Sequence, residues 1–92
     1  MSRYRVTYWK EIPTAFVVEG DGRTVKKQLS QKIQNLIDAY AMSLGLTSTE
    51  DYSAQYRRGE WTEREGAPEE AAGALLAELE EEFGKFQIPR RG

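Results

Sequence analysis

Residues 3–20, RYRVTYWKEIPTAFVVEG, decide the fold because they read as two strands with a short interruption between them. Polar and apolar side chains alternate through residues 3–10, which is typical of a strand with two differently occupied faces. We expect the core face to carry Tyr4, Val6 and Tyr8, and the other face to carry Arg5, Thr7 and Trp9. This stretch therefore predicts a sheet whose second face is open to solvent or to a partner.

The residues that follow predict two further strands of the same sheet. Pro13 cannot donate to a strand ladder and so separates the first strand from the apolar, β-branched run at residues 15–19. Gly20–Gly22 reads GDG, which suits a tight turn, and residues 24–29 then form the third strand. We expect a further short strand around Trp61, where alternation resumes.

Helical spacing appears in two main segments. Apolar residues recur three and four positions apart in residues 30–44, which begin at Ser30 and end before Gly45. Residues 68–84 repeat the pattern after Pro68, a residue type suited to a first helical turn. Between them, Ser48 with Asp51 three residues on predicts the start of a short helix that carries Tyr52 and Tyr56 and ends at Gly59.

These elements predict a single small α+β domain over residues 1–92. We expect an antiparallel sheet of three to four strands with the helices 30–44 and 68–84 packed on one face. Residues 85–92 are expected to form an irregular tail.

Composition excludes several classes of function. The 92 residues include no cysteine and no histidine, so disulfides, thiolate nucleophiles, histidine catalysis and the usual zinc sites are absent. Carboxylate pairs are present, but no third polar group or apolar pocket accompanies them in the sequence pattern. We therefore expect no enzyme, no catalytic residues, no metal and no cofactor. Neither a signal peptide nor a membrane span is visible, so we expect a cytoplasmic protein.

Charge is divided unevenly along the chain. Residues 1–46 carry a net charge of +3 and residues 47–92 a net charge of −5, within a total of −2. The acidic residues concentrate in the last predicted helix, where they are typical of a solvated helix face. The cations of the sheet are thus separated in sequence from most of the carboxylates.

Several residues are of the types that contribute most to protein interfaces. Large aromatic side chains and arginine combine a large buried area with a polar group, and they dominate interface hot spots. Our candidates for partner binding are Arg5, Trp9, Arg57, Arg58 and Trp61, and we expect Trp9, Arg58 and Trp61 to share one exposed patch. The expected partner is another protein, bound by a monomer or a homodimer of this chain.

Residues 24–59 support an alternative. Their order of strand, helix, Gly-containing turn and helix resembles the ribbon-helix-helix family of DNA-binding repressors, in which outward strand residues enter the major groove. The resemblance implies that Thr24, Lys26 and Gln28 would contact bases. That family needs a dimer with paired strands, whereas this strand has a preceding strand available, and the whole chain is acidic.

Nearly the whole chain resembles a small bacterial family known as the virulence factor domain. The most distinctive parts are YWKEIP at residues 8–13 and RRGEW at residues 57–61. The family occurs as stand-alone proteins of about this length and as a module of larger chains, and the resemblance implies no catalytic activity. Its usual genomic neighbours include folate and corrinoid one-carbon enzymes, which implies an accessory subunit of a complex in that metabolism.

Overall fold

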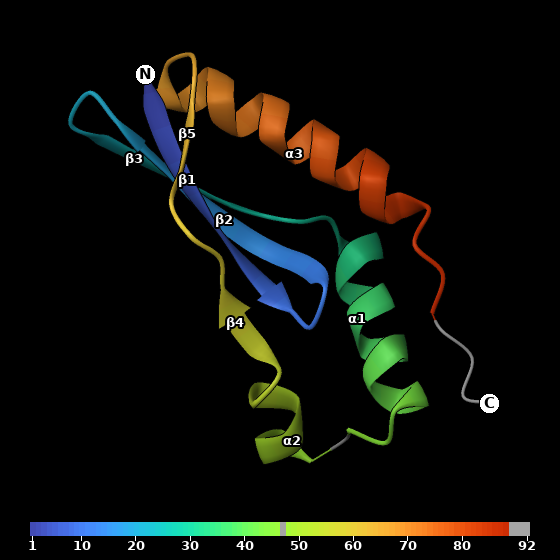
Figure 1. The fold of residues 1–92 in the computed structure, drawn as a ribbon. Coiled ribbons are helices and arrows are strands. Elements are labelled where there is room, and N and C mark those ends of the chain that lie inside the picture. Colours follow the sequence, from blue (N-terminus) through green and yellow to red (C-terminus); the bar gives the residue numbers. More distant parts are fainter. Residues whose placement is uncertain (47, 89–92) are drawn as a thin grey trace.

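Two long antiparallel strands, β1 (Ser2–Trp9) and β2 (Ile12–Gly20), form the centre of this computed structural model, which describes residues 1–46 and 48–88 (Figure 1). β3 (Arg23–Gln28) pairs with β2 along its whole length. The turn between them uses positive φ at Asp21 (50°) and Gly22 (74°), as the GDG motif predicts. β3 is the last strand on its side of the described sheet.

Two short strands complete the other side of β1. β4 (Tyr56–Arg58) pairs with the end of β1 at Thr7–Trp9, and β5 (Thr62–Arg64) pairs with its beginning at Ser2–Tyr4. Between them the amide of Gly59 donates to the carbonyl of Val6 at 2.8 Å. The described sheet therefore has five strands, all antiparallel, and the α+β fold class is confirmed.

The second helix is shorter than its sequence predicts. α2 (Thr49–Ser53) does begin as expected, because the Ser48 hydroxyl accepts a hydrogen bond from the Asp51 amide at 3.1 Å. It ends before Tyr56, which starts β4 instead. The amide of Lys10, just after β1, donates to the carbonyl of Gln55 at 3.1 Å and draws the chain onto the sheet. So short a helix has little stability of its own, and this pairing outweighs it.

Two longer helices match the predicted ranges closely. α1 (Gln31–Ser43) is followed by Gly45 in the left-handed conformation, and α3 (Pro68–Gly84) begins at a proline. The carboxylate of Glu80 accepts hydrogen bonds from the Ser30 amide at 2.6 Å and the Ser30 hydroxyl at 2.7 Å, which ties α3 to the start of α1. None of the helices in the described part of the chain has the length and apolar run needed to cross a bilayer.

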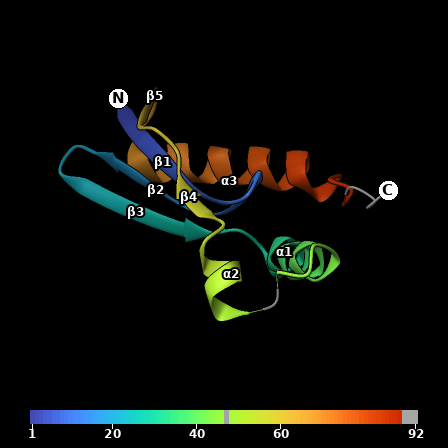
Figure 2. The ribbon, with the colours of Figure 1, turned by 60° about the horizontal axis from the view of Figure 1, so that its bottom comes forward.

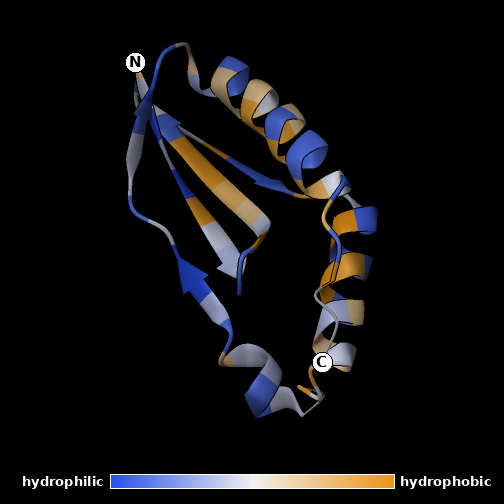
Figure 3. Cartoon of the chain, turned by 45° about the vertical axis from the view of Figure 1, so that its right-hand side comes forward, coloured by the Kyte–Doolittle hydropathy of each residue, from blue (hydrophilic) through white to orange (hydrophobic). Residues whose placement is uncertain are grey.

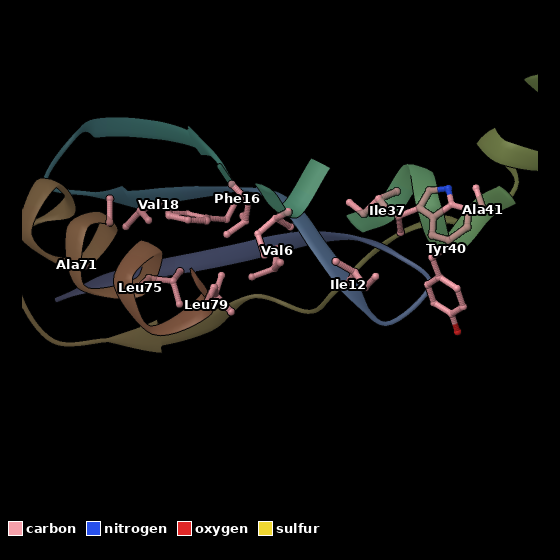
Figure 4. Packing of buried hydrophobic residues seen from close by; sticks show 14 residues of the cluster. Val6, Ile12, Phe16, Val18, Ile37, Tyr40, Ala41, Ala71, Leu75 and Leu79 are labelled. Carbon is pink, nitrogen blue, oxygen red and sulfur yellow. The ribbon is translucent and has the colours of Figure 1, made fainter. Parts of the chain in front are cut away.

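The core lies mainly between α3 and the sheet. Figure 4 shows Leu75 and Leu79 of α3 facing Val6, Phe16 and Val18, all of which are buried. The hydropathy colouring follows this division, with hydrophobic residues along β2 and on the helices (Figure 3). Burial of such side chains contributes roughly 1.5–3 kcal/mol each to folding.

The end of the β1–β2 hairpin forms a second part of the core. Trp9 and Ile12, which are paired there, are both 0% exposed. The Trp9 ring lies 5.7 Å from Tyr40 of α1 and 5.3 Å from Tyr52 of α2, and its Nε1 donates to the Tyr52 carbonyl at 2.9 Å. The prediction that Trp9 lies on an exposed face is therefore wrong, because α1 and α2 cover this end of the hairpin.

The chain after α3 packs back along α1. Residues 85–88 have no regular structure, and the ring of Phe86 lies 5.8 Å from that of Tyr40. Residues 89–92 of the expected tail lie outside the described residues.

Candidate functional site

One face of the sheet is not covered by α3. Figure 2 shows α3 on one side of the sheet, and because Val6, Phe16 and Val18 point toward α3, the alternate positions of each strand point away from it. The strand register assigns to this face, which we call the open sheet face, Arg3, Arg5, Thr7, Ala15, Val17, Glu19, Thr24, Lys26, Gln28, Arg58 and Glu63. None of these residues is buried.

Strand pairing orders the open sheet face into rows that cross the strands. The first row is Arg58, Thr7, Ala15 and Gln28, from β4 to β3. The second row is Arg5, Val17 and Lys26. In both rows the small side chain belongs to β2 and longer side chains flank it, which leaves a hollow along the middle of the face.

That hollow is a groove of about 430 Å³. Its floor includes Ala15 and Val17, and its sides include residues of β1, β3 and β4, with Trp61 at the rim. The complete lining is Arg5, Thr7, Ala15, Phe16, Val17, Glu19, Lys26, Lys27, Gln28, Arg58 and Trp61. The groove is thus built by residues distant in sequence and brought together by the sheet.

Trp61 lies beside two arginines of β1. Its side chain is 38% exposed, and the Cζ atoms of Arg3 and Arg5 lie 4.4 and 5.9 Å from its ring centroid. Both distances are within the range of cation–π attraction. Arg5 also donates from Nε to the Gly59 carbonyl at 2.9 Å, so it holds the segment that precedes Trp61 against β1.

The charges of the open sheet face are only partly neutralised. Arg3 forms an ion pair with Glu19 at 2.9 Å, and Glu63 is its neighbour in the strand register. Lys26 and Arg58 have no ion pair or side-chain hydrogen bond with any residue in 1–46 or 48–88. The groove therefore combines unpaired cations with an exposed tryptophan ring, in a chain of net charge −2.

The structure brings together two sets of predicted residues that the sequence treated as alternatives. Arg5, Arg58 and Trp61, from the protein-binding set, line the same groove as Lys26 and Gln28 from the DNA-binding set. Thr24 lies further along β3 on the same face. A ligand at this groove would contact members of both sets.

Two predicted residues do not join this surface. Trp9 is buried under α1 and α2. Arg57 pairs with Tyr8 and lies on the other face of the sheet, with its Cζ 4.6 Å from the Tyr8 ring and its Nε donating to the Lys10 carbonyl at 3.1 Å. Successive strand residues point to opposite faces, so forming β4 separates Arg57 from Arg58.

The sequence-based candidates missed the floor of the groove. Ala15 and Val17 alternate with the buried Phe16 and Val18, and this alternation was available in the AFVV segment. Small side chains carry little chemical signal by themselves, so their role follows only from their position between longer neighbours.

Groups with shifted pKa values lie away from the groove. Burial raises the pKa of Tyr40 to about 12, helped by a hydrogen bond to Glu11 at 2.7 Å and by its charge. Burial is also the main cause of the raised pKa of Tyr52. At neutral pH both phenols are therefore protonated hydrogen-bond donors. Within residues 1–46 and 48–88, no three carboxylates gather as metal ligands would.

The ion pair between β5 and α3 is structural. Arg64 donates to Glu78 through both terminal nitrogens, and this hydrogen bonding lowers the pKa of the Glu78 carboxyl. The pair connects the short strand β5 to the helix that covers the other face of the sheet. It does not line the groove.

Comparison with known proteins gives a family. Neither the curated proteins nor the solved structures contain a match to this chain. The model of the Virulence factor family matches residues 7–90. This range includes the whole of YWKEIP and the whole of RRGEW. The chain therefore belongs to the Virulence factor family.

Proposed function

We propose that this protein is a non-enzymatic interaction module, an accessory subunit of a cytoplasmic complex, which binds another protein through its open sheet face. The observation that carries the proposal is the groove itself, in which Trp61, Lys26 and Arg58 surround a floor of small side chains. A link to one-carbon or corrinoid metabolism stays a prediction from the family resemblance.

The composition of the groove supports binding rather than solvation alone. An antiparallel sheet commonly has one face on the core and one face in water, and a solvated face is usually polar throughout. Here an exposed indole ring lies beside a hollow with an alanine and a valine in its floor. Tryptophan and arginine at the centre of an interface are the residues whose truncation most often weakens binding.

The positions of the reactive groups favour a module without catalysis. Tyr40, Tyr52 and Glu78, whose pKa values are shifted, are absent from the lining of the groove. The groove offers guanidinium, ammonium, hydroxyl and amide groups, which bind and orient a ligand, and the carboxylate among its lining residues, Glu19, is ion-paired with Arg3. General acid–base catalysis needs a proton donor or acceptor within reach of the reacting atoms, with a pKa near the working pH.

Site-specific photo-crosslinking in the native cells tests this proposal. A benzophenone side chain replaces Gln28, which lines the groove, and in a matched variant it replaces Ala74, which is exposed on α3. We expect a defined protein adduct from position 28 and none of the same mass from position 74. Identical adducts from both positions, or adducts only from position 74, would reject the open sheet face as the binding surface.

DNA binding is the second candidate function, supported by the exposure of Lys26 and Arg58 on one face. β3 is hydrogen-bonded to β2 along its length, so a ribbon of two β3 strands would have a β2 strand on each side. The major groove admits a two-stranded ribbon, and this sheet is wider. A specific duplex that binds at physiological salt, and is lost in Lys26→Ala, would favour DNA over protein.

A further inference from the structure

The charges of the open sheet face indicate which kind of protein segment would bind there. This inference rests on the proposed function. Arg58 and Lys26 stand on opposite sides of the groove, on β4 and β3, and both are exposed. Neither has an anionic partner in residues 1–46 or 48–88. Carboxylates are the complementary groups for such cations in a partner protein.

The sheet sets the spacing of these carboxylates. From β4 to β3 there are three steps between neighbouring strands, in the order β4, β1, β2, β3. Neighbouring strands are about 4.8 Å apart, and Arg58 and Lys26 lie in adjacent rows, about 7 Å apart along the strands, so the span between them is roughly 16 Å. An extended chain advances about 3.4 Å per residue and therefore covers this span in about four to five residues, and the long side chains of Arg58 and Lys26 can make up the difference. Two acidic residues four positions apart, at i and i+4, would reach both cations.

The floor of the groove determines which side chain the segment can carry between its two acidic residues. In an extended segment, residues i, i+2 and i+4 point to the same side. The middle residue of a segment that crosses the strands therefore points at Ala15 and Val17, whose side chains are small. Thr7 and Gln28 flank this floor with hydroxyl and amide groups that can bond the backbone of the segment. The floor favours a small apolar side chain at i+2.

We propose that the groove binds an extended segment of a partner protein that crosses the strands with acidic residues at i and i+4 and a small apolar residue at i+2. The carboxylates bind Arg58 and Lys26, and the residue between them packs on Ala15 and Val17. The exposed edge of Trp61 covers the apolar part of the segment from the rim of the groove.

A protein segment fits these residues better than single-stranded nucleic acid. Proteins that bind single strands offer several aromatic side chains on which successive bases stack. Among the residues that line the groove, Trp61 alone offers an exposed aromatic ring, and Arg3 already lies against that ring. The net charge of −2 also disfavours a long polyanion.

Titration of the isotope-labelled full chain by NMR tests the inference with defined probes. The first probe is an otherwise uncharged dodecapeptide with Glu-Ser-Ala-Ser-Glu at its centre, and the second moves the last glutamate one position closer, to i+3. We expect saturable shifts of the amides of Thr7, Val17, Lys26 and Arg58 with the first probe, and several-fold weaker binding of the second. Absence of saturable shifts with the first probe, or equal affinity for both, would overturn the inference.

Charge reversal identifies the cations involved. We expect Arg58→Glu and Lys26→Glu each to weaken binding of the first peptide about tenfold, a loss of about 1.4 kcal/mol. The matched controls are Arg57→Glu, on the same strand but the opposite face, and Lys32→Glu, exposed on α1. Each variant is first compared with the parent spectrum, and the two groove variants give independent results if one of them fails to fold. Equal losses in groove and control variants would indicate general charge attraction and reject the site.

A third probe tests whether the groove prefers the carboxylates of a peptide or the phosphates of a nucleic acid. A twelve-nucleotide oligothymidine is titrated at the same ionic strength, and we expect weaker binding than that of the first peptide. Tighter binding of the oligonucleotide would overturn the protein-segment inference in favour of nucleic acid. If both peptides fail while crosslinking from position 28 still captures a partner, the proposed function stands and the acidic-segment chemistry falls.

Discussion

The two tryptophans mark two regions of this molecule that differ in burial and in the residues around the indole ring. Trp9 is 0% exposed, its Nε1 is hydrogen-bonded, and aromatic rings from two helices enclose it. Trp61 is 38% exposed, and its neighbours are the arginines of an open groove. The region around Trp9 is part of the core and the region around Trp61 is part of the exposed surface, although the residue type is the same. The neighbours of a tryptophan, rather than its hydrophobicity, determine which role it has.

The largest expected effect distinguishes the two tryptophans by stability. Trp9→Ala removes a fully buried ring and the hydrogen bond from its Nε1 to the Tyr52 carbonyl, so we expect the free energy of unfolding to fall by roughly 3–5 kcal/mol. Trp61→Ala, the matched control, should cost about 1 kcal/mol or less, because its ring is partly solvated. Urea denaturation followed by circular dichroism measures both. Similar losses in the two variants would remove the distinction.

The next largest effect is a pH dependence of the free energy of unfolding, which arises from Tyr40 in the buried region around Trp9. The pKa of Tyr40 is raised to about 12, above its ordinary value of 10.0. The unfolded chain therefore loses this proton first as the pH rises, and the stabilisation that is fully present below pH 10 declines between about pH 10 and 12. We expect the free energy of unfolding to fall over that window, and to fall less steeply in Tyr40→Phe.

A second variant separates the causes of this shift. Glu11→Gln removes the neighbouring charge but leaves Tyr40 buried, and burial is the larger cause of the raised pKa. The pH dependence in Glu11→Gln should therefore be intermediate between those of the parent and Tyr40→Phe. A slope equal to that of Tyr40→Phe would show that Glu11, rather than burial, dominates.

Fluorescence quenching sharpens the same comparison with smaller changes of the two side chains. In Trp61→Phe the remaining indole is that of Trp9, which is buried, so acrylamide should quench its emission weakly. In Trp9→Phe the remaining indole is that of Trp61, which is exposed, and the quenching constant should be several-fold larger. Unfolding in urea should make the two variants alike. Equal quenching in the folded state would mean that Trp61 is covered in solution.

The smallest effect concerns the two arginines of β4. Arg58→Ala should change the free energy of unfolding by less than about 0.5 kcal/mol, as is usual for an exposed residue without specific contacts. Arg57→Ala removes a hydrogen bond to Lys10 and a contact with the Tyr8 ring, so we expect a loss of about 0.5–1 kcal/mol. Thermal denaturation of the two variants side by side measures the difference. The reverse order would contradict the assignment of these arginines to opposite faces.

Local patterns in the sequence were sufficient for much of the fold. The β1–β2–β3 order, the GDG turn, α1 and α3 each follow from alternation, helical spacing or turn residues within a short window. The open sheet face and its Arg5 were also predictable, because alternation in the first strand separates two faces. These elements depend on neighbours in sequence, which is what such patterns report. Trp61 was expected within a strand, whereas it lies between β4 and β5.

Contacts between distant segments account for the errors. β4 forms because residues 56–58 meet β1, and nothing in their local sequence distinguishes a strand from the end of a helix. Missing β4 also meant that both Arg57 and Arg58 were candidates for partner binding, although they lie on opposite faces of the sheet. Trp9 was assigned to the surface because the helices that cover it come from residues 31–43 and 49–53. Tertiary packing thus overrode a correct local pattern.

The arrangement of β4 and β5 on β1 links the proposed binding surface to the protection of a sheet edge. These two strands of three residues each cover an edge that would otherwise present unpaired amides and carbonyls of β1. The same segment, residues 56–64, carries Arg58 and Trp61. If it detaches, the groove loses two of its lining residues and the β1 edge becomes available for pairing with another chain. We therefore expect a ligand that holds Arg58 and Trp61 in the groove to slow hydrogen exchange in β1 and to suppress aggregation at its edge.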